Sequence, residues 1–314
     1  MKLKVATIGV RALSREGGIE TYCRNVLSEV AVLGHEVLIY TRRRHDPRRA
    51  WRGLALVPTA SLPGGLETLS HAFMALTHCA FVTRPDVVSF QAIGPALLAP
   101  FARLMGFGVV VRHVGEDWRR SKWGFVGAAT LRLAERSAAR FAHVVICLND
   151  DAAKQFCGRL RPRAEVRVVR NPVPRPEPDV GREALERFGL TAGRYVLASS
   201  RITPEKGLET LVAAFGDSSL GKRGWTLLVA GDVRPSTAYR RRIVALAEAT
   251  PDTILTGELD KLTLTQLYAC AGLFVMPSHH EGMSFSLLEA MSHGLRCIVS
   301  DIPANRAVCD VHGT

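Results

Sequence analysis

Short apolar runs alternate with segments of helical periodicity along the whole chain of 314 residues. In the first half, runs rich in Val, Ile and Leu predict buried strands, and the periodic segments between them predict helices. The predicted strands span 4–9, 34–41, 54–57, 85–91, 108–113, 143–148 and 165–170, and the predicted helices span 18–33, 66–82, 95–105 and 125–140, with a short one before the last strand. This alternation predicts a parallel sheet.

The same alternation begins again after Asn171-Pro-Val-Pro-Arg-Pro-Glu-Pro178. Four prolines in this segment remove backbone donors and favour an extended chain, so residues 171–178 are predicted to link a domain at 1–170 to one at 179–314. Further strands are predicted at 195–200, 225–230, 253–256, 273–276 and 297–300, and further helices at 183–188, 207–215, 237–249, 262–270 and from about 284. The pattern predicts an α/β protein of two Rossmann-like, doubly wound domains that face a cleft.

Charge separates the two halves. The net charge of +12 is the sum of +14 from residues 1–175 and −2 from residues 176–314. A basic first half suits an anionic membrane, an anionic lipid-linked substrate or nucleic acid, and the alternative is an arginine-rich solvated surface. No apolar run approaches the ~20 residues that span a bilayer, and the first residues are not typical of a secretory signal. We therefore expect a cytoplasmic protein.

One stretch of the second half combines several features of a binding site. An apolar run stops at Pro277, a polar loop follows, and a helical pattern begins near Ser284. The carboxyl end of a strand next to a helix start favours an anion such as phosphate. Glu281 and Glu289 lie roughly 10 Å apart along the helix axis, which suits two hydroxyl-bearing ends of one ligand. Alternatively, Glu281 caps the helix and Glu289 is solvated.

Three further loops follow predicted strands. Arg201-Ile-Thr-Pro-Glu-Lys206-Gly207 places two cations near a helix start, which suits a diphosphate without a metal. Gly17-Gly18 opens the first helix and permits close approach of a ligand, although it matches neither GxGxxG nor a Walker motif. His113 ends a strand, where it would bond a sugar hydroxyl, take part in proton transfer, or bond the backbone at the edge of the core.

The cysteines indicate no metal or redox chemistry. All seven are scattered without a Cys-x-x-Cys pair, which favours reduced thiols. No Asp-x-Asp motif or His/Cys cluster accompanies the Arg201–Gly207 loop, so no metal and no cofactor besides a donor substrate are expected.

Together these motifs resemble the retaining, metal-independent glycosyltransferases of family 4 (glycosyl transferases group 1), which have the GT-B fold, and especially members of bacterial polysaccharide assembly. The resemblance runs through nearly the whole chain. Four segments carry it: Gly17–Glu20 is similar to the family's first glycine turn, Arg112–Gly124 to its histidine-glycine loop, Arg201–Gly207 to its Arg-x-x-x-x-Lys-Gly segment, and Glu281–Glu289 to its glutamate pair with seven residues between.

The resemblance implies roles for residues of the second half. Arg201 and Lys206 would hold the donor diphosphate and stabilise it as it leaves. Glu281 would contact the donor sugar, and Glu289 would bind the ribose hydroxyls. The backbone amides near the distal phosphate would be those of Met283, Ser284 and Phe285.

In the first half, the resemblance implies that Gly17 and Gly18 approach the diphosphate or sugar from the opposite domain. His113 would bond the donor sugar near its reacting centre. The nucleotide base would lie near residues 258–262, and the acceptor would be selected by loops at 10–16, 42–52 and 116–122. The implied reaction moves a sugar from a nucleotide-diphosphate sugar to a hydroxyl of a glycan or lipid-linked glycan at the cytoplasmic membrane face, in cell-surface polysaccharide biosynthesis.

Two departures keep a second hypothesis open. Asn171-Pro172 stands where the family usually carries Asn-Gly, and the end at Thr314 leads us to expect a shortened second domain. The alternative is therefore a non-catalytic GT-B protein that binds a nucleotide sugar or a partner. Nucleic-acid binding is disfavoured, because the basic residues lack interleaved aromatic residues and no nucleic-acid fold signature occurs.

Overall fold

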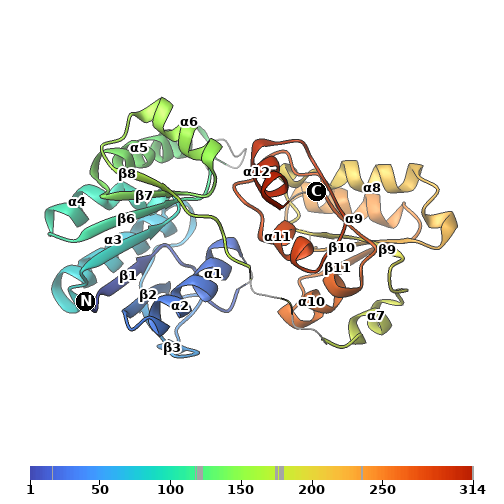
Figure 1. Cartoon of the computed structure of the whole chain (residues 1–314), viewed down its shortest axis with the longest axis horizontal. Coiled ribbons are helices and arrows are strands. Elements are labelled where there is room, and N and C mark those ends of the chain that lie inside the picture. The colour runs from blue at the N-terminus through green and yellow to red at the C-terminus, as the bar shows by residue number, and fades with distance from the viewer. Residues whose placement is uncertain are drawn as a thin grey trace. The chain divides into compact units, whose positions relative to one another are not determined.

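The computed structural model describes residues 1–15, 17–116, 118, 123–173, 176, 180–234 and 236–312. It divides into two compact units, Met1–Pro172 and Val173–Thr314, here called unit 1 and unit 2. Unit 1 runs from blue to green in Figure 1, and unit 2 runs from yellow-green to red. The division falls inside the proline-rich segment 171–178, of which residues 174, 175, 177 and 178 lie outside the described residues.

Unit 1 is built on an eight-stranded sheet in the order β3-β4-β2-β1-β5-β6-β7-β8. Neighbouring strands in this sheet are parallel, except for the short antiparallel pair of β3 and β4. The strands are β1 (Lys4–Ile8), β2 (Glu36–Arg42), β3 (Ala50–Trp51), β4 (Leu54–Thr59), β5 (Val87–Gln91), β6 (Gly108–His113), β7 (Val144–Cys147) and β8 (Glu165–Val168). The two-residue strand β3 lies in the basic run and was not predicted.

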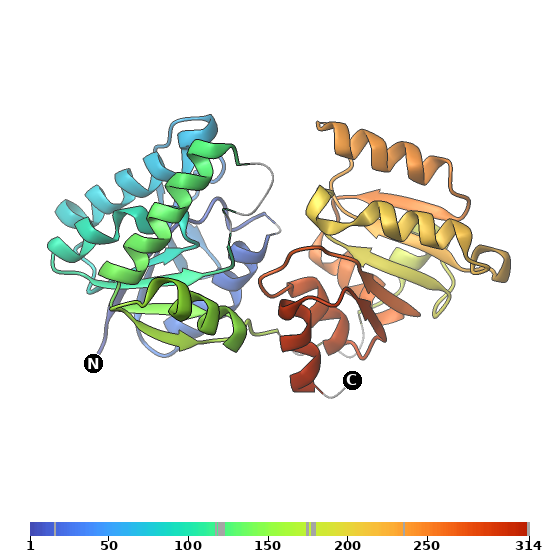
Figure 2. The same ribbon diagram turned by 90° about the horizontal axis from the view of Figure 1, so that it is seen from above.

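Helices connect these strands and cover the sheet. They are α1 (Gly18–Tyr22), α2 (Ser28–Val32), α3 (Glu67–His78), α4 (Ala99–Leu104), α5 (Phe125–Phe141) and α6 (Asp150–Leu160), with 3-10 turns η2 (Gly64–Leu66) and η4 (Gly94–Leu98). The chain moves outward from β1 to β2 through α1 and α2, and in the opposite direction from β5 to β8 through α4 to α6. Right-handed crossovers place these two helix sets on opposite faces. Figure 2 shows α4 and α5 side by side, as their contacts also indicate.

Two predicted helices of unit 1 contain π-helical turns. The helix expected at 18–33 consists of α1, the π-helix η1 (Cys23–Leu27) and α2. The helix expected at 66–82 consists of α3 and the π-helix η3 (Cys79–Thr83). The core between sheet and helices combines strand residues such as Phe90 and Val111 with small helix residues such as Ala99 and Ala138, all buried.

Unit 2 has a five-stranded parallel sheet in the order β11-β10-β9-β12-β13. Its elements are α7 (Glu183–Phe188), β9 (Tyr195–Ser199), η6 (Pro204–Lys206), α8 (Leu208–Asp217), η7 (Gly221–Arg223), β10 (Thr226–Ala230), α9 (Ala238–Glu248), β11 (Thr253–Gly257), α10 (Lys261–Cys270), β12 (Leu273–Met276), α11 (Phe285–Ser292), β13 (Cys297–Val299) and α12 (Pro303–His312). The final helix α12 was not predicted. Both units have the α/β, Rossmann-like architecture that the alternating pattern predicts, and this prediction is confirmed.

All seven cysteines are free thiols. In the described part of the chain, no helix is both long enough and apolar enough to cross a membrane.

Candidate functional site

The carboxyl edge of the unit 2 sheet brings together two of the predicted loops. The loop after β9 and the loop after β12 are in contact, because His279 donates its backbone N–H to the Glu205 carbonyl at 2.9 Å. Gly207 stands between them with φ +60°, and a Cβ at this position would lie 2.3 Å from the Pro277 carbonyl oxygen. Such a close approach requires glycine. The candidate site residue Lys206 is therefore followed directly by the glycine that permits the two loops to meet.

Lys206 and Glu281 form an ion pair across these loops. Lys206 Nζ lies 2.5 Å from Glu281 Oε1, and the two side chains are only 11% and 10% exposed. An ammonium group has three N–H donors, so Lys206 retains donors for an anion after it binds Glu281. The structure therefore brings together two residues that are 75 positions apart, and both were site candidates.

Arg201 lies close to this pair in sequence but remains more open. It follows β9, its side chain is 57% exposed, and its guanidinium lies 3.7 Å from the Glu205 carboxylate. An exposed guanidinium with a loose ion pair reorganises easily around a phosphate. Its position is compatible with the predicted diphosphate role.

The start of α11 carries the three residues predicted to face a phosphate. Ser284 is the N-cap, and its side chain accepts a hydrogen bond from Leu287 N at 3.5 Å. Met283 is buried and precedes the cap, and Phe285 is the first helical residue. The beginning of a helix presents backbone N–H groups and the positive end of the helix dipole.

Glu289, on the same helix, has a partner that sequence reasoning missed. Lys261 at the start of α10 places Nζ 2.5 Å from Glu289 Oε1, and the Glu289 side chain is 14% exposed. Lys261 lies within residues 258–262, the predicted region for the nucleotide base. Only the motif position of Glu289 was readable in the sequence, since Lys261 lies 28 residues away.

A third charged cluster, centred on Asp232, follows β10, and sequence reasoning did not identify it as part of the site. Asp232 accepts hydrogen bonds from Arg234 at 2.7 Å and Arg240 at 3.0 Å, and Arg234 lies 3.8 Å from Glu258. The hydrogen bond from Arg234, helped by the charge of Arg240, holds the pKa of Asp232 well below its usual value. The Gly231-Asp232 pair after a buried strand was the available signal.

In unit 1, the glycine turn begins α1 and is anchored by a residue that was not predicted. Gly17 is the N-cap in extended conformation, and Gly18 is the first helical residue and exposed. Arg24 in the π-helical turn donates to the carbonyls of Leu13 at 2.7 Å and Arg15 at 2.9 Å. These bonds fix the loop that leads into the turn, whose residue 16 lies outside the described residues.

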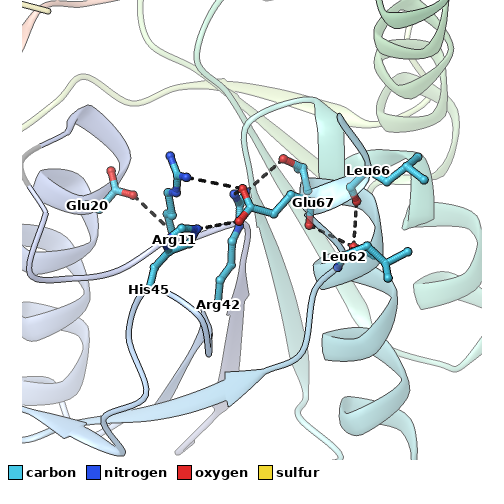
Figure 3. A network of polar contacts seen from close by, with 9 residues as sticks. Arg11, Glu20, Arg42, His45, Leu62, Leu66 and Glu67 are labelled. Carbon is cyan, nitrogen blue, oxygen red and sulfur yellow. Dashed lines mark hydrogen bonds and ion pairs between the residues drawn. The ribbon is translucent and has the colours of Figure 1, made fainter. Parts of the chain in front are cut away.

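A polar network lies beside this turn (Figure 3). Glu67 accepts from Arg42 at 2.5 Å and His45 at 2.6 Å, and Arg11 lies 3.8 Å away. Burial would raise the pKa of Glu67, but the hydrogen bond from His45 and the charge of Arg42 outweigh burial and lower it. Glu20 accepts from the backbone N–H of Arg11 at 3.3 Å, so the network continues to the Gly17–Glu20 segment. It occupies part of the region predicted to select the acceptor.

His113 is buried at the carboxyl end of β6 and is held by a carboxylate, whereas one sequence hypothesis had it bonded to the backbone. Its Nε2 lies 2.9 Å from Glu135 Oε1, and its side chain is 3% exposed. Burial would raise the pKa of Glu135, but hydrogen bonds from His113 and Arg159 lower it to about 2. Glu135 is therefore ionised, and Nε2 carries the proton. His113 Nδ1 is buried and has no hydrogen-bond partner within the described residues.

Other residues of the histidine-glycine loop are only partly described. Arg159 also lies 2.9 Å from Glu116, one of the loop acids. Asp117 and residues 119–122 lie outside the described residues. Glu135 and Arg159 were missed by sequence reasoning, because a helical Glu and Arg give no signal of their own.

Comparison with known proteins assigns the family. Residues 16–175 match the family model described as Glycosyltransferase Family 4, and residues 193–314 match that of Glycosyl transferases group 1. The chain is also 30% identical over 312 residues to a 2-deoxystreptamine N-acetyl-D-glucosaminyltransferase of Streptomyces fradiae, a match that covers 88% of this chain and 73% of the relative. The chain belongs to glycosyltransferase family 4. Its resemblance to that family is thereby confirmed.

Other similarities agree with this assignment. The glycosyltransferase is 23% identical to a GDP-mannose-dependent phosphatidylinositol monomannoside mannosyltransferase of Mycolicibacterium smegmatis, over 90% of this chain and 76% of the relative. Its structure resembles WaaG, a glycosyltransferase involved in lipopolysaccharide biosynthesis, with a TM-score of 0.76 and 17% identity over 98% of this chain and 84% of WaaG. A sucrose-phosphate synthase from Thermosynechococcus elongatus has a TM-score of 0.78 at 19% identity, covering 96% and 82%. These likenesses confirm the GT-B fold, and the non-catalytic hypothesis is not favoured.

Proposed function

We propose that this glycosyltransferase moves a hexosyl or deoxyhexosyl group from a nucleotide-diphosphate sugar to a hydroxyl of a glycan or lipid-linked glycan. The reaction retains the anomeric configuration and needs no metal ion or further cofactor. It serves cell-surface polysaccharide biosynthesis in the cytoplasm, at the inner face of an anionic plasma membrane. Relatives that use GDP-mannose or act on phosphatidylinositol monomannoside support the donor and acceptor classes.

The ion pair between Lys206 and Glu281 carries the proposal. Breaking a sugar–phosphate bond places positive charge on the sugar and additional negative charge on the departing diphosphate. A fixed cation near the start of a helix stabilises that negative charge, and such preorganised electrostatics are usually the largest catalytic contribution. Glu281 orients the ammonium group and offers its second oxygen to a sugar hydroxyl. Lys206, Arg201 and the first turn of α11 thus form one diphosphate site within unit 2.

The other candidates extend this assignment along the donor. Glu289 and its partner Lys261 bind the ribose hydroxyls and approach the base. In unit 1, we assign His113 to the donor sugar, because Glu135 holds its Nε2 and its Nδ1 has no hydrogen-bond partner within the described residues. Retention follows if the acceptor hydroxyl attacks the face from which the diphosphate leaves and passes its proton to a departing phosphate oxygen.

Donor hydrolysis in the presence of EDTA tests the proposal. We expect turnover of a nucleotide-diphosphate sugar to persist in EDTA, and Lys206→Ala and Arg201→Ala to lower kcat by about 10²–10³ each, since each removes a stabilising donor. Lys222→Ala is the matched control, because Lys222 is an exposed lysine of unit 2 in the η7 turn.

Two outcomes would count against the proposal. Loss of wild-type turnover in EDTA, restored by a divalent ion, would refute metal independence. Turnover that is as fast in Lys206→Ala as in Lys222→Ala would show that the diphosphate binds elsewhere. The anomeric configuration of the product, read by nuclear magnetic resonance, decides between retention and inversion.

A further inference from the structure

The amino edge of the unit 1 sheet, where its strands begin, is rich in exposed apolar side chains. In a parallel sheet with helical crossovers, each helix ends at the edge where the next strand begins. This amino edge therefore lies away from His113 and the glycine turn, which follow the carboxyl ends of strands. Large apolar side chains that are 38–84% exposed stand where helices end, just before β2, β5, β6 and β7: Val32, Leu33, Phe81, Val82, Leu104, Met105 and Phe141.

The order of strands in the sheet places these exposed side chains in a row along its amino edge. β2, β1, β5, β6 and β7 are consecutive neighbours in the sheet, and the fully exposed Met1 precedes β1. Adjacent strands lie about 4.8 Å apart, so the helix ends follow one another along the edge. A contiguous exposed apolar surface marks an interaction site in a soluble protein, whereas isolated exposed residues do not.

A cavity of about 530 Å³ lies at the end of this row. It is bounded by η4 and α4, by the last turns of α5, and by the end of α6 with the residues that follow it. Its apolar lining includes Leu97, Leu133 and Phe141, the last of which also belongs to the row. Its charged lining consists of Arg136, Arg140, Arg161 and Arg163, and none of the residues that line it is Asp or Glu.

These four arginines carry positive charge that no nearby carboxylate offsets among the described residues. In the described part of the chain, none of them forms an ion pair with a carboxylate. Three acidic residues of the same edge are already bonded elsewhere: Glu36 pairs with Lys4 at 3.1 Å, Asp86 accepts from the backbone N–H of Lys4 at 2.7 Å, and Glu165 pairs with Arg167 at 2.5 Å. The cavity therefore combines an apolar wall with uncompensated positive charge, which matches an amphiphilic anion.

We propose that this amino edge docks on a bilayer of anionic phospholipids, with a lipid phosphate held by the arginines of the cavity. Exposed Phe, Leu and Met side chains enter the headgroup region, and guanidinium groups bind phosphate oxygens in pairs. A second copy of the chain would present the same positive charge, which disfavours self-association through this surface. Nucleic acid would use the arginines but not the apolar row. The inference localises the membrane contact of the proposed function and is independent of the chemistry of transfer.

Vesicle flotation of the whole protein tests this surface. We expect binding to vesicles of phosphatidylcholine mixed with phosphatidylglycerol, and little binding to phosphatidylcholine alone. The double variant Arg140→Gln/Arg163→Gln should lower the partition coefficient at least tenfold, because each basic residue near an anionic surface contributes about 1 kcal/mol. Phe81→Ser/Leu104→Ser should weaken binding without changing net charge, and both residues are highly exposed, so folding is preserved.

The matched control is Arg44→Gln/Arg49→Gln, which removes the same charge from exposed residues between β2 and β3. We expect its partition coefficient to fall by less than about threefold. Equal losses in the two arginine doubles would overturn the proposal in favour of general attraction by the basic unit. Absence of wild-type binding, with a sedimentation mass that falls in Phe81→Ser/Leu104→Ser, would overturn it in favour of self-association.

Donor hydrolysis in solution separates this inference from the proposed function. The two amino-edge doubles, Arg140→Gln/Arg163→Gln and Phe81→Ser/Leu104→Ser, should hydrolyse the donor at the wild-type rate, and Lys206→Ala should lose hydrolysis while it still floats with anionic vesicles. Vesicle binding that disappears in Lys206→Ala would contradict the assignment of docking to the amino edge.

Discussion

At the scale of single residues, the buried carboxylate of Glu135 fixes the imidazole ring of His113 in one orientation. Glu135 accepts from Nε2, and Phe156 packs edge-on against the ring with centroids 5.2 Å apart. Because the pKa of Glu135 is about 2, the carboxylate is ionised at neutral pH and fixes the ring's orientation and tautomer. Arg159, at 2.8 Å, shares the same carboxylate oxygen and offsets its buried charge.

Glu135→Gln should therefore destabilise unit 1 by about 3 kcal/mol at neutral pH, because it leaves the buried His113 ring and the Arg159 guanidinium without the carboxylate that both contact. The carboxylate's pKa is lowered from 4.5 to about 2 by folding, so its contribution to stability is present above pH 4.5 and is lost as the pH falls toward 2. Urea denaturation across this range should show the wild type and the variant converging in stability as the pH decreases.

Glu165→Gln provides the control, since Glu165 pairs with Arg167 at 2.5 Å but both side chains are more than half exposed. Exposed pairs contribute about 0–1 kcal/mol. Equal destabilisation in Glu165→Gln and Glu135→Gln, or a gap that does not narrow in acid, would contradict the role assigned to Glu135.

At the scale of elements, the donor site of unit 2 depends on two loops that meet at Gly207. The turn η6 ends at this residue in a left-handed conformation and α8 begins after it, while the loop after β12 crosses close to its α-carbon. The contact sets the positions from which Lys206 and Glu281 reach each other. A side chain at this glycine would separate the loops.

Gly207→Ala should destabilise unit 2 by roughly 2–4 kcal/mol and weaken nucleotide binding, because the added Cβ would lie 2.3 Å from the Pro277 carbonyl oxygen as well as at φ +60°. Gly224→Ala is a close control: it has φ +73° but no atom within 4 Å of the added Cβ. It should lose only about 1 kcal/mol and bind nucleotide normally. Denaturation midpoints and calorimetric titration measure both effects, and identical behaviour of the two variants would refute the loop contact.

The elements also show what the sequence can and cannot specify. Helix α7 and strand β12 have the predicted bounds, because apolar periodicity and flanking Gly or Pro define them locally. The π-helical turns at Cys23–Leu27 and Cys79–Thr83 were missed, since they change the backbone hydrogen-bond partner with little change in apolar periodicity.

For the candidate site, motifs identified Lys206, Glu281 and Glu289 but not the side chains that position them. Lys261 lies 28 residues from Glu289, and Glu135 lies 22 residues from His113. Such pairs arise only when helices pack on a sheet, so no local pattern reveals them. The roles inferred from the family motifs stay predictions, whereas the pairing of Lys206 with Glu281 is now a structural observation.

At the scale of the whole molecule, the chain consists of two units with separate sheets and separate hydrophobic cores. The excess positive charge belongs to the first unit, where the proposed membrane surface lies. The candidate diphosphate site belongs to the second, whose residues are close to electrical neutrality. Binding of a lipid surface and binding of a donor thus depend on different cores, and each can be followed by its effect on the stability of its own unit.

A nucleoside diphosphate should therefore stabilise unit 2 selectively. At a concentration near 100 times Kd, binding to the folded state contributes about 2.7 kcal/mol, which raises the Tm of a domain of this size by roughly 10 °C. Two transitions are expected on heating, because each unit has its own core.

Amide hydrogen exchange read by mass spectrometry identifies the transition that moves: slower exchange should appear in peptides from β9, η6 and α11, with smaller changes in peptides of the unit 1 core. Lys206→Ala should abolish the shift, and Lys222→Ala should retain it. Protection confined to unit 1 would contradict the assignment of the donor site to unit 2.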